Sequence, residues 1–148
     1  KTMSAVKGVN RTKMDTPTPA NRLSPGSSDG RVKCSIDTYE AAALAAASTI
    51  TLGSKLTKGS IVLFQILSYD ALGGSVTLDV GDAEDDNRYA DNIDVSAAGH
   101  TVLASLADGV MYETDESVAA TLDTQVIITT AGAAATGTIK LITLYTND

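Results

Sequence analysis

The chain has 148 residues, of which 43% are hydrophobic and 20% charged, and its formal net charge is −7. This length suits one domain, and neither a transmembrane run of ~20 apolar residues nor a signal peptide is recognisable. Cys34 and His100 are the only cysteine and histidine, which excludes an internal disulfide and multi-histidine metal sites. We therefore expect a structural protein without enzymatic activity, metal or cofactor.

The charge is divided unevenly along the chain. Residues 1–33 contain seven basic and two acidic side chains (+5), whereas residues 34–148 contain four basic and sixteen acidic ones (−12). A basic segment joined to an acidic body suggests two surfaces that face different partners. One such partner could be the acidic body of a neighbouring copy.

Residues 1–30 are predicted to form an extended N-terminal arm, followed by a body over residues 31–148. The three prolines of the protein, Pro17, Pro19 and Pro25, all lie in this arm among turn-forming residues. Proline disfavours helix interiors and central strands, and such a segment buries too little apolar surface to fold alone. We expect the arm to lie against its own body or a neighbouring subunit.

The body begins with two segments that predict β-strands. Residues 31–38 alternate, with Val32, Cys34 and Ile36 on one face, and we expect that face, Cys34 included, to be buried. After a short strand at 49–52, residues 61–67 are almost continuously apolar, which is typical of a strand covered on both faces. One cover would be the opposite sheet, and the other could be a subunit contact.

Further strands are predicted at 75–80, 93–96, 101–106, 110–113, 124–130 and 138–146. The segment Tyr39–Ala47 is rich in alanine and has high helix propensity. Because it continues an alternating strand without a break, strand followed by loop is favoured over a helix. About eight short strands with glycine and aspartate turns predict an all-β fold, an antiparallel β-sandwich of jelly-roll type.

The acidic segment 79–94 is the densest group of candidate ligands. Asp82, Glu84 and Asp86 match the first ligand positions of a calcium loop, but Asn87 and Ile93 occupy the positions of its glycine and glutamate. A solvated loop in which Arg88 neutralises one or two carboxylates is favoured, and calcium bound in another geometry stays open. Solvated carboxylates also make poor glycosidase acids, since a raised pKa requires burial.

Two other chemistries are disfavoured by the sequence. A Cys34–His100 nucleophile pair would need the two residues to meet beside an orienting group, and His100 is better explained as a turn or subunit-contact residue. Nucleic acid is not an expected partner, because the basic residues of the arm are scattered and no phosphate-binding glycine motif is present.

Several short motifs carry a family resemblance over roughly residues 50–146. They are a strand start at Lys55–Val62, a strand exit at Ser75–Asp82, the acidic loop closing in Arg88-Tyr89, and a final strand from Ala135 to Leu141. This pattern resembles the small head decoration (cement) proteins of tailed bacteriophages, although Thr57 stands where proline is common. The resemblance implies a jelly-roll body on the outer capsid surface of the virion, as a symmetric oligomer, with a trimer favoured over a dimer.

The expected partners are accordingly the major capsid protein and neighbouring copies, with no membrane. The residues predicted to dock the arm are Lys7, Arg11, Lys13, Arg22 and Arg31. Two alternatives stay open. One is a tail, baseplate or fibre-attachment module of the virion, and the other is a carbohydrate-binding β-sandwich that uses calcium at Asp82, Glu84 and Asp86.

Overall fold

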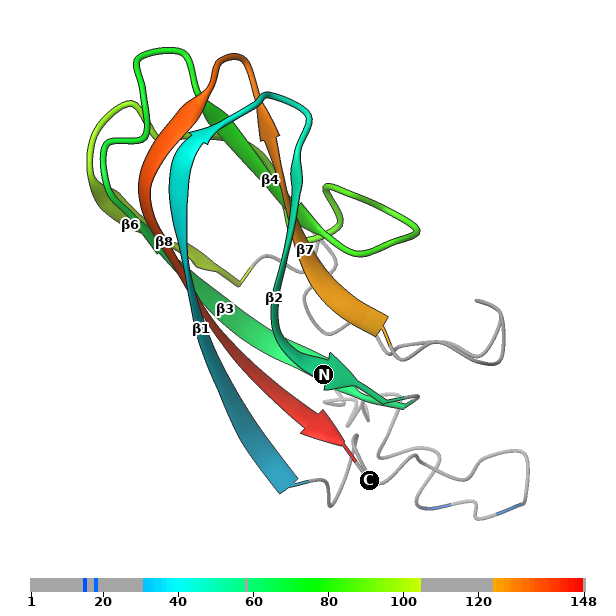
Figure 1. The fold of residues 1–148 in the computed structure, drawn as a ribbon. Helices are drawn as coiled ribbons and strands as arrows, with labels where there is room; N and C mark the ends of the chain where they lie inside the picture. The colour runs from blue at the N-terminus through cyan, green and yellow to red at the C-terminus, as the bar shows by residue number, and fades with distance from the viewer. Residues whose placement is uncertain (1–14, 16–17, 19–30, 58, 105–123, 148) are drawn as a thin grey trace, which may run out of the picture.

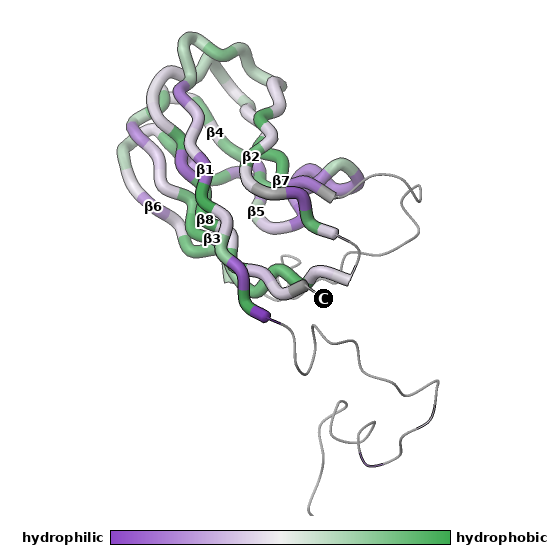
Figure 2. Tube along the Cα trace, turned by 60° about the horizontal axis from the view of Figure 1, so that its bottom comes forward, coloured by the Kyte–Doolittle hydropathy of each residue, from purple (hydrophilic) through white to green (hydrophobic). Residues whose placement is uncertain are grey.

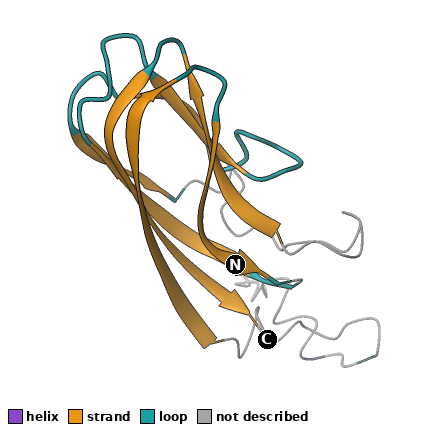
Figure 3. Ribbon diagram, viewed as in Figure 1, coloured by secondary structure: helices purple, strands orange, loops and turns teal. Residues whose placement is uncertain are grey.

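The structure is a computed structural model that describes residues 15, 18, 31–57, 59–104 and 124–147. Its regular elements are all strands joined by loops (Figures 1 and 3). The eight strands are β1 (Arg31–Leu44), β2 (Thr49–Leu56), β3 (Ile61–Tyr69), β4 (Thr77–Gly81), β5 (Ala90–Asp94), β6 (Gly99–Leu103), β7 (Thr124–Ala131) and β8 (Ala135–Asn147).

The strands form two four-stranded antiparallel sheets, ordered β1-β8-β3-β6 and β2-β7-β4-β5. Strands β1 to β4 pair with β8 to β5 in reverse order, as in one long antiparallel hairpin. The further pairs β3–β8 and β4–β7 roll that hairpin into two layers. This is the arrangement of a jelly roll, so the predicted fold class is confirmed.

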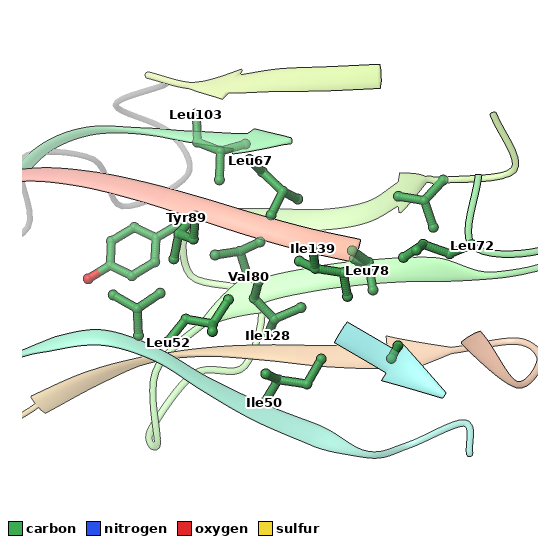
Figure 4. Packing of buried hydrophobic residues seen from close by; sticks show 14 of the residues in the cluster. Ile50, Leu52, Leu67, Leu72, Leu78, Val80, Tyr89, Leu103, Ile128 and Ile139 are labelled. Atoms are coloured by element: carbon green, nitrogen blue, oxygen red, sulfur yellow. The ribbon is translucent and has the colours of Figure 1, made fainter. Parts of the chain in front are cut away.

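A single hydrophobic core fills the space between the sheets (Figure 4). One sheet contributes Ile50, Leu52, Leu78, Val80 and Ile128, and the other contributes Leu67, Leu103, Ile139 and Leu141. Inward residues recur at every second position, as a pleated strand requires. Tyr89, which follows the acidic loop, is 1% exposed and closes the core from the β4–β5 side.

Most predicted strands occur within a few residues of their expected positions. Residues 39–44 belong to β1, and a turn follows at residues 46–47, as predicted for this alanine-rich segment. Pairing of β1 with β8 therefore overrides the local helix propensity. The strand expected at 110–113 and the arm over residues 1–30, apart from residues 15 and 18, lie outside the described residues.

The predicted burial of Val32, Cys34 and Ile36 is wrong. Val32 is 60% and Ile36 61% exposed, and Cys34 is also exposed, whereas Ser35 between them is buried. Residues opposite each other in an antiparallel pair share one face of the sheet. Ser35 lies opposite Thr143, on the face of β8 that buries Leu141 and Ile139, and this register turns Cys34 and Ile36 outward.

Across the described ranges, the structure contains no helix long and apolar enough to span a membrane.

Candidate interaction surface

The outer face of sheet β1-β8-β3-β6 has a row of aliphatic side chains across all four strands. Ile36 on β1 lies opposite Ile142 on β8, Ile142 lies opposite Ile66 on β3, and Ile66 lies opposite Val102 on β6. At about 4.8 Å between strands, this row is roughly 14 Å wide. Val102 is 56% exposed, so the row is open to solvent at both edges.

A second row lies beside the first, two residues along the strands. It consists of Cys34, Leu144 and Phe64, in register on β1, β8 and β3. The large hydrophobic side chains exposed in the described chain, Val32, Ile36 and Val102, all belong to this sheet. The outward-facing group is called here the apolar face, and its members are Val32, Cys34, Ile36, Phe64, Ile66, Val102, Ile142 and Leu144.

The apolar face is bounded at one end by a polar row. Thr38, Lys140, Ser68 and His100 lie in register across the same four strands, and all four are exposed. Within the apolar face itself, Cys34 is the only side chain with an ionisable group. The outer face of this sheet therefore changes from apolar to polar within two residues along each strand.

The outer face of the second sheet has the opposite character. Thr49, Thr129 and Asp79 form one register row, and Thr77 lies opposite Ala131 on one side and Asp94 on the other. Threonine and aspartate side chains favour contact with water. Figure 2, coloured by hydropathy, allows the two sheets to be compared along their strands. Of the two outer faces in the described part of the chain, that of β1-β8-β3-β6 is better suited to bury apolar surface against a partner.

Between β4 and β5, the acidic loop is organised by a buried carboxylate. Asp82 is 4% exposed and accepts hydrogen bonds from the backbone N–H groups of Glu84 and Asp85. Its Oδ2 lies 2.6 Å from Arg88 Nε, and Arg88 Nη2 lies 3.7 Å from Glu84 Oε2. The predicted neutralisation by Arg88 is confirmed, although Asp82 is buried rather than solvated.

Three other aspartates accept backbone hydrogen bonds: Asp37 links β1 to β2, Asp70 links a loop to β8, and Asp94 holds the turn after β5. The pKa of Asp37 is lowered by hydrogen bonds from the backbone N–H groups of Gly53 and Thr38. Hydrogen bonds from the backbone N–H and then the hydroxyl of Thr138 lower the pKa of Asp70, and Ser96 acts in the same way on Asp94. All three carboxylates are solvent-accessible structural acceptors.

The part of the chain that the structure describes brings together neither a metal site nor a Cys–His pair. No three carboxylate, histidine or cysteine side chains gather there in a geometry for a metal ion. Cys34 and His100 lie on β1 and β6, the opposite edges of one sheet. With three strand spacings between these edges, they are roughly 14 Å or more apart, too far for a nucleophile–base hydrogen bond.

Comparison with solved structures finds the same fold in phage capsids. The chain resembles one from the capsid asymmetric unit of cyanophage Pam1, with a TM-score of 0.66 and 28% identity over 86% of this chain and 94% of that one. The chain is a phage capsid-related protein. A chain from the capsid of Ralstonia phage GP4 also has this fold, with a TM-score of 0.58 and 24% identity over 86% and 92% of the two chains.

No protein-family model and no curated protein matches the sequence of this capsid-related protein. Its structural neighbours thus support the general part of the expected role, that of a structural component of a phage virion. Of the residues predicted to dock the arm, Arg31 is exposed at the start of β1. Lys7, Arg11, Lys13 and Arg22 lie outside the described residues.

The apolar face of the capsid-related protein was only partly accessible to sequence reasoning. The continuous apolar run of residues 61–67 did indicate a strand covered on both sides, and Phe64 and Ile66 face outward from it. The same signal in β8, where Ile139, Leu141, Ile142 and Leu144 follow closely, would have identified the central strands of this face. The contribution of β1 was missed because its hydrophobic residues were assigned to the core.

Proposed function

We propose that this capsid-related protein is a decoration (cement) protein, which binds the outer surface of an icosahedral phage head and stabilises it. The observation that carries the proposal is the likeness to a chain of the Pam1 capsid asymmetric unit, which covers 86% of this chain and 94% of that one. A rigid jelly roll with one apolar and one polar outer face suits a protein whose task is to occupy a seam between other subunits.

The basic arm supplies the second contact in this proposal. Residues 1–33 have a net charge of +5, opposite to that of acidic protein surfaces. Residues Lys7, Arg11, Lys13, Arg22 and Arg31 would dock the arm on the major capsid protein or on neighbouring copies. An arm that becomes ordered on binding can cover a large surface. Two tethered weak contacts then strengthen each other, because each raises the effective concentration of the other.

Co-sedimentation of the purified protein with undecorated phage heads, over a series of salt concentrations, tests the role. We expect the protein to sediment with the heads and to be released as the ionic strength rises, since exposed charge pairs are screened by salt. Absence of binding to heads at low salt would contradict the proposal. Immunogold label found on tails would instead support the tail or baseplate alternative.

A further inference from the structure

We infer that the apolar face is the surface through which copies of this protein associate with one another, as a sheet-on-sheet contact. The observation behind it is the row Ile36, Ile142, Ile66 and Val102, which is in register across all four strands and has two strongly exposed ends. The idea that this contact forms on the phage head rests on the proposed decoration role. The contact between copies can nevertheless be measured without heads.

The shape of the surface fits an identical partner. A flat sheet face with two rows of aliphatic side chains is self-complementary, because rows from two such faces can interdigitate. The two sheets within each jelly roll already pack in this way, at the ~10 Å spacing common to stacked sheets. A second copy presents the same rows, so an isologous contact buries the apolar side chains of both copies at once. Such a contact joins the copies in pairs, unlike the trimer that the family resemblance implies.

Charge selects a second copy over the basic arm as the occupant. Two chains with a net charge of −7 repel each other, and juxtaposed like charges disfavour a contact. The apolar face lacks acidic and basic side chains, so copies can approach there without placing carboxylates against each other. The basic N-terminal segment, residues 1–33 with a net charge of +5, is attracted to the acidic surface instead. That surface includes Asp79 and Asp94 on the second sheet.

The size of the surface predicts how strong this contact is. Four strands of about 4.8 Å spacing and two rows about 7 Å apart give an apolar patch of a few hundred Å², below the ~800 Å² per partner of a standard interface. Association in solution is therefore expected to be reversible and concentration-dependent. On a head, where copies are held close together, the same contact would be strengthened by effective concentration.

Sedimentation equilibrium of the full-length protein, with single lysine substitutions, tests this inference. Ile36→Lys and Val102→Lys place a charge on residues that are already solvent-exposed in the isolated chain, so folding is preserved. Thr38→Lys is the matched control, since Thr38 lies on the same face of the same strand but in the polar row. Thr51→Lys places the same charge on the outer face of the other sheet.

We expect the wild type, Thr38→Lys and Thr51→Lys to self-associate, and Ile36→Lys and Val102→Lys to do so roughly 100-fold more weakly, because a charge is costly in an apolar interface. A second readout is the native thiol of Cys34, which lies on the apolar face. Its reaction with a maleimide should slow as wild-type protein is concentrated and should stay fast in Ile36→Lys. Circular dichroism verifies that every variant is folded.

Three results would overturn the inference. One is a wild-type protein that stays monomeric up to about 100 μM. Another is an oligomer that Ile36→Lys and Val102→Lys leave intact. The third is protection of Cys34 by heads but not by other copies, which would assign the apolar face to the capsid shell. An oligomer that fails to bind heads would count against the decoration role alone.

Discussion

Ile36 of β1 and Ile142 of β8 lie directly opposite each other on the outer face of their sheet, although both have the character of core residues. Their neighbours in sequence, Asp37 and Leu141, are likewise register partners and point toward the other sheet. In β8 both faces of the strand are therefore apolar, as in the middle layer of a three-layer structure. A jelly roll has only two layers, so this pattern favours the proposed contact of the apolar face with a second copy.

The outward assignment of Ile36 predicts a difference between two alanine substitutions. Ile36→Ala removes cross-strand contacts on an open face and should lower the free energy of unfolding by about 0.2–1 kcal/mol. Ile139→Ala creates a cavity at a residue that is 0% exposed and should cost about 2–5 kcal/mol. Urea denaturation at protein concentrations where the monomer dominates measures both. Equal costs would place Ile36 in the core.

Much of the fold was predictable because several strands alternate, the others are short apolar runs, and their turns contain glycine and aspartate. Alternation alone does not determine which face of β1 points inward. It shows that Val32, Cys34 and Ile36 share a face. Whether that face is buried depends on the register with β8, a strand more than 90 residues later in the sequence. The usual assumption that hydrophobic residues point inward fails where a sheet serves a partner.

The turn between β7 and β8 predicts a strong effect of one glycine substitution. Gly132 has φ of +82°, and a β-carbon there would collide with the backbone carbonyl oxygen of Ser75. Gly132→Ala should therefore destabilise the protein by at least about 1–3 kcal/mol, the usual range for a strained backbone. Gly74→Ala is the control, since nothing lies within 4 Å of a β-carbon at that position. A similar melting temperature for both variants would contradict this turn geometry.

The buried ion pair of the acidic loop predicts that Asp82 contributes more to stability than its neighbours. Asp82→Ala leaves the Arg88 guanidinium, whose side chain is 15% exposed, without its carboxylate at 2.6 Å. Breaking a buried pair in this way typically costs about 3–5 kcal/mol. Glu84→Ala, at a side chain that is 39% exposed, should change stability by less than about 1 kcal/mol. Thermal denaturation of both variants measures the difference, and equal effects would show that Asp82 does not organise the loop.

The lowered pKa values of Asp37, Asp70 and Asp94 predict acid sensitivity. In the folded state the pKa of each carboxyl group lies below its ordinary value of 3.8, so each group binds a proton more weakly than in the unfolded chain. The stabilisation is therefore fully present above that value and is lost as the pH falls through the lower, folded-state values. The melting temperature of the wild type should drop below about pH 4. The triple variant Asp37→Asn, Asp70→Asn, Asp94→Asn should show a shallower decline over the same pH range, and an unchanged slope would contradict the prediction.

The arm is the part of the chain for which the sequence suggests a function, but its residues, apart from 15 and 18, lie outside the described structure. Composition alone identifies the arm, because the prolines and seven of the eleven basic side chains fall within residues 1–33. No periodic pattern in that segment specifies a partner strand. Its contacts therefore depend on the surface that it meets, and mutation is the direct way to locate them.

Charge reversal in the arm should weaken binding to phage heads without unfolding the body. Arg11→Glu and Lys13→Glu each replace a positive charge of the proposed docking arm with a negative one. We expect each to lower the affinity for undecorated heads about 2- to 5-fold, as for exposed ion pairs, with an unchanged melting temperature. Lys55→Glu, an exposed position on β2, makes the same change in net charge on the body. If Lys55→Glu reduces co-sedimentation as much as the arm variants, net charge rather than the arm governs binding.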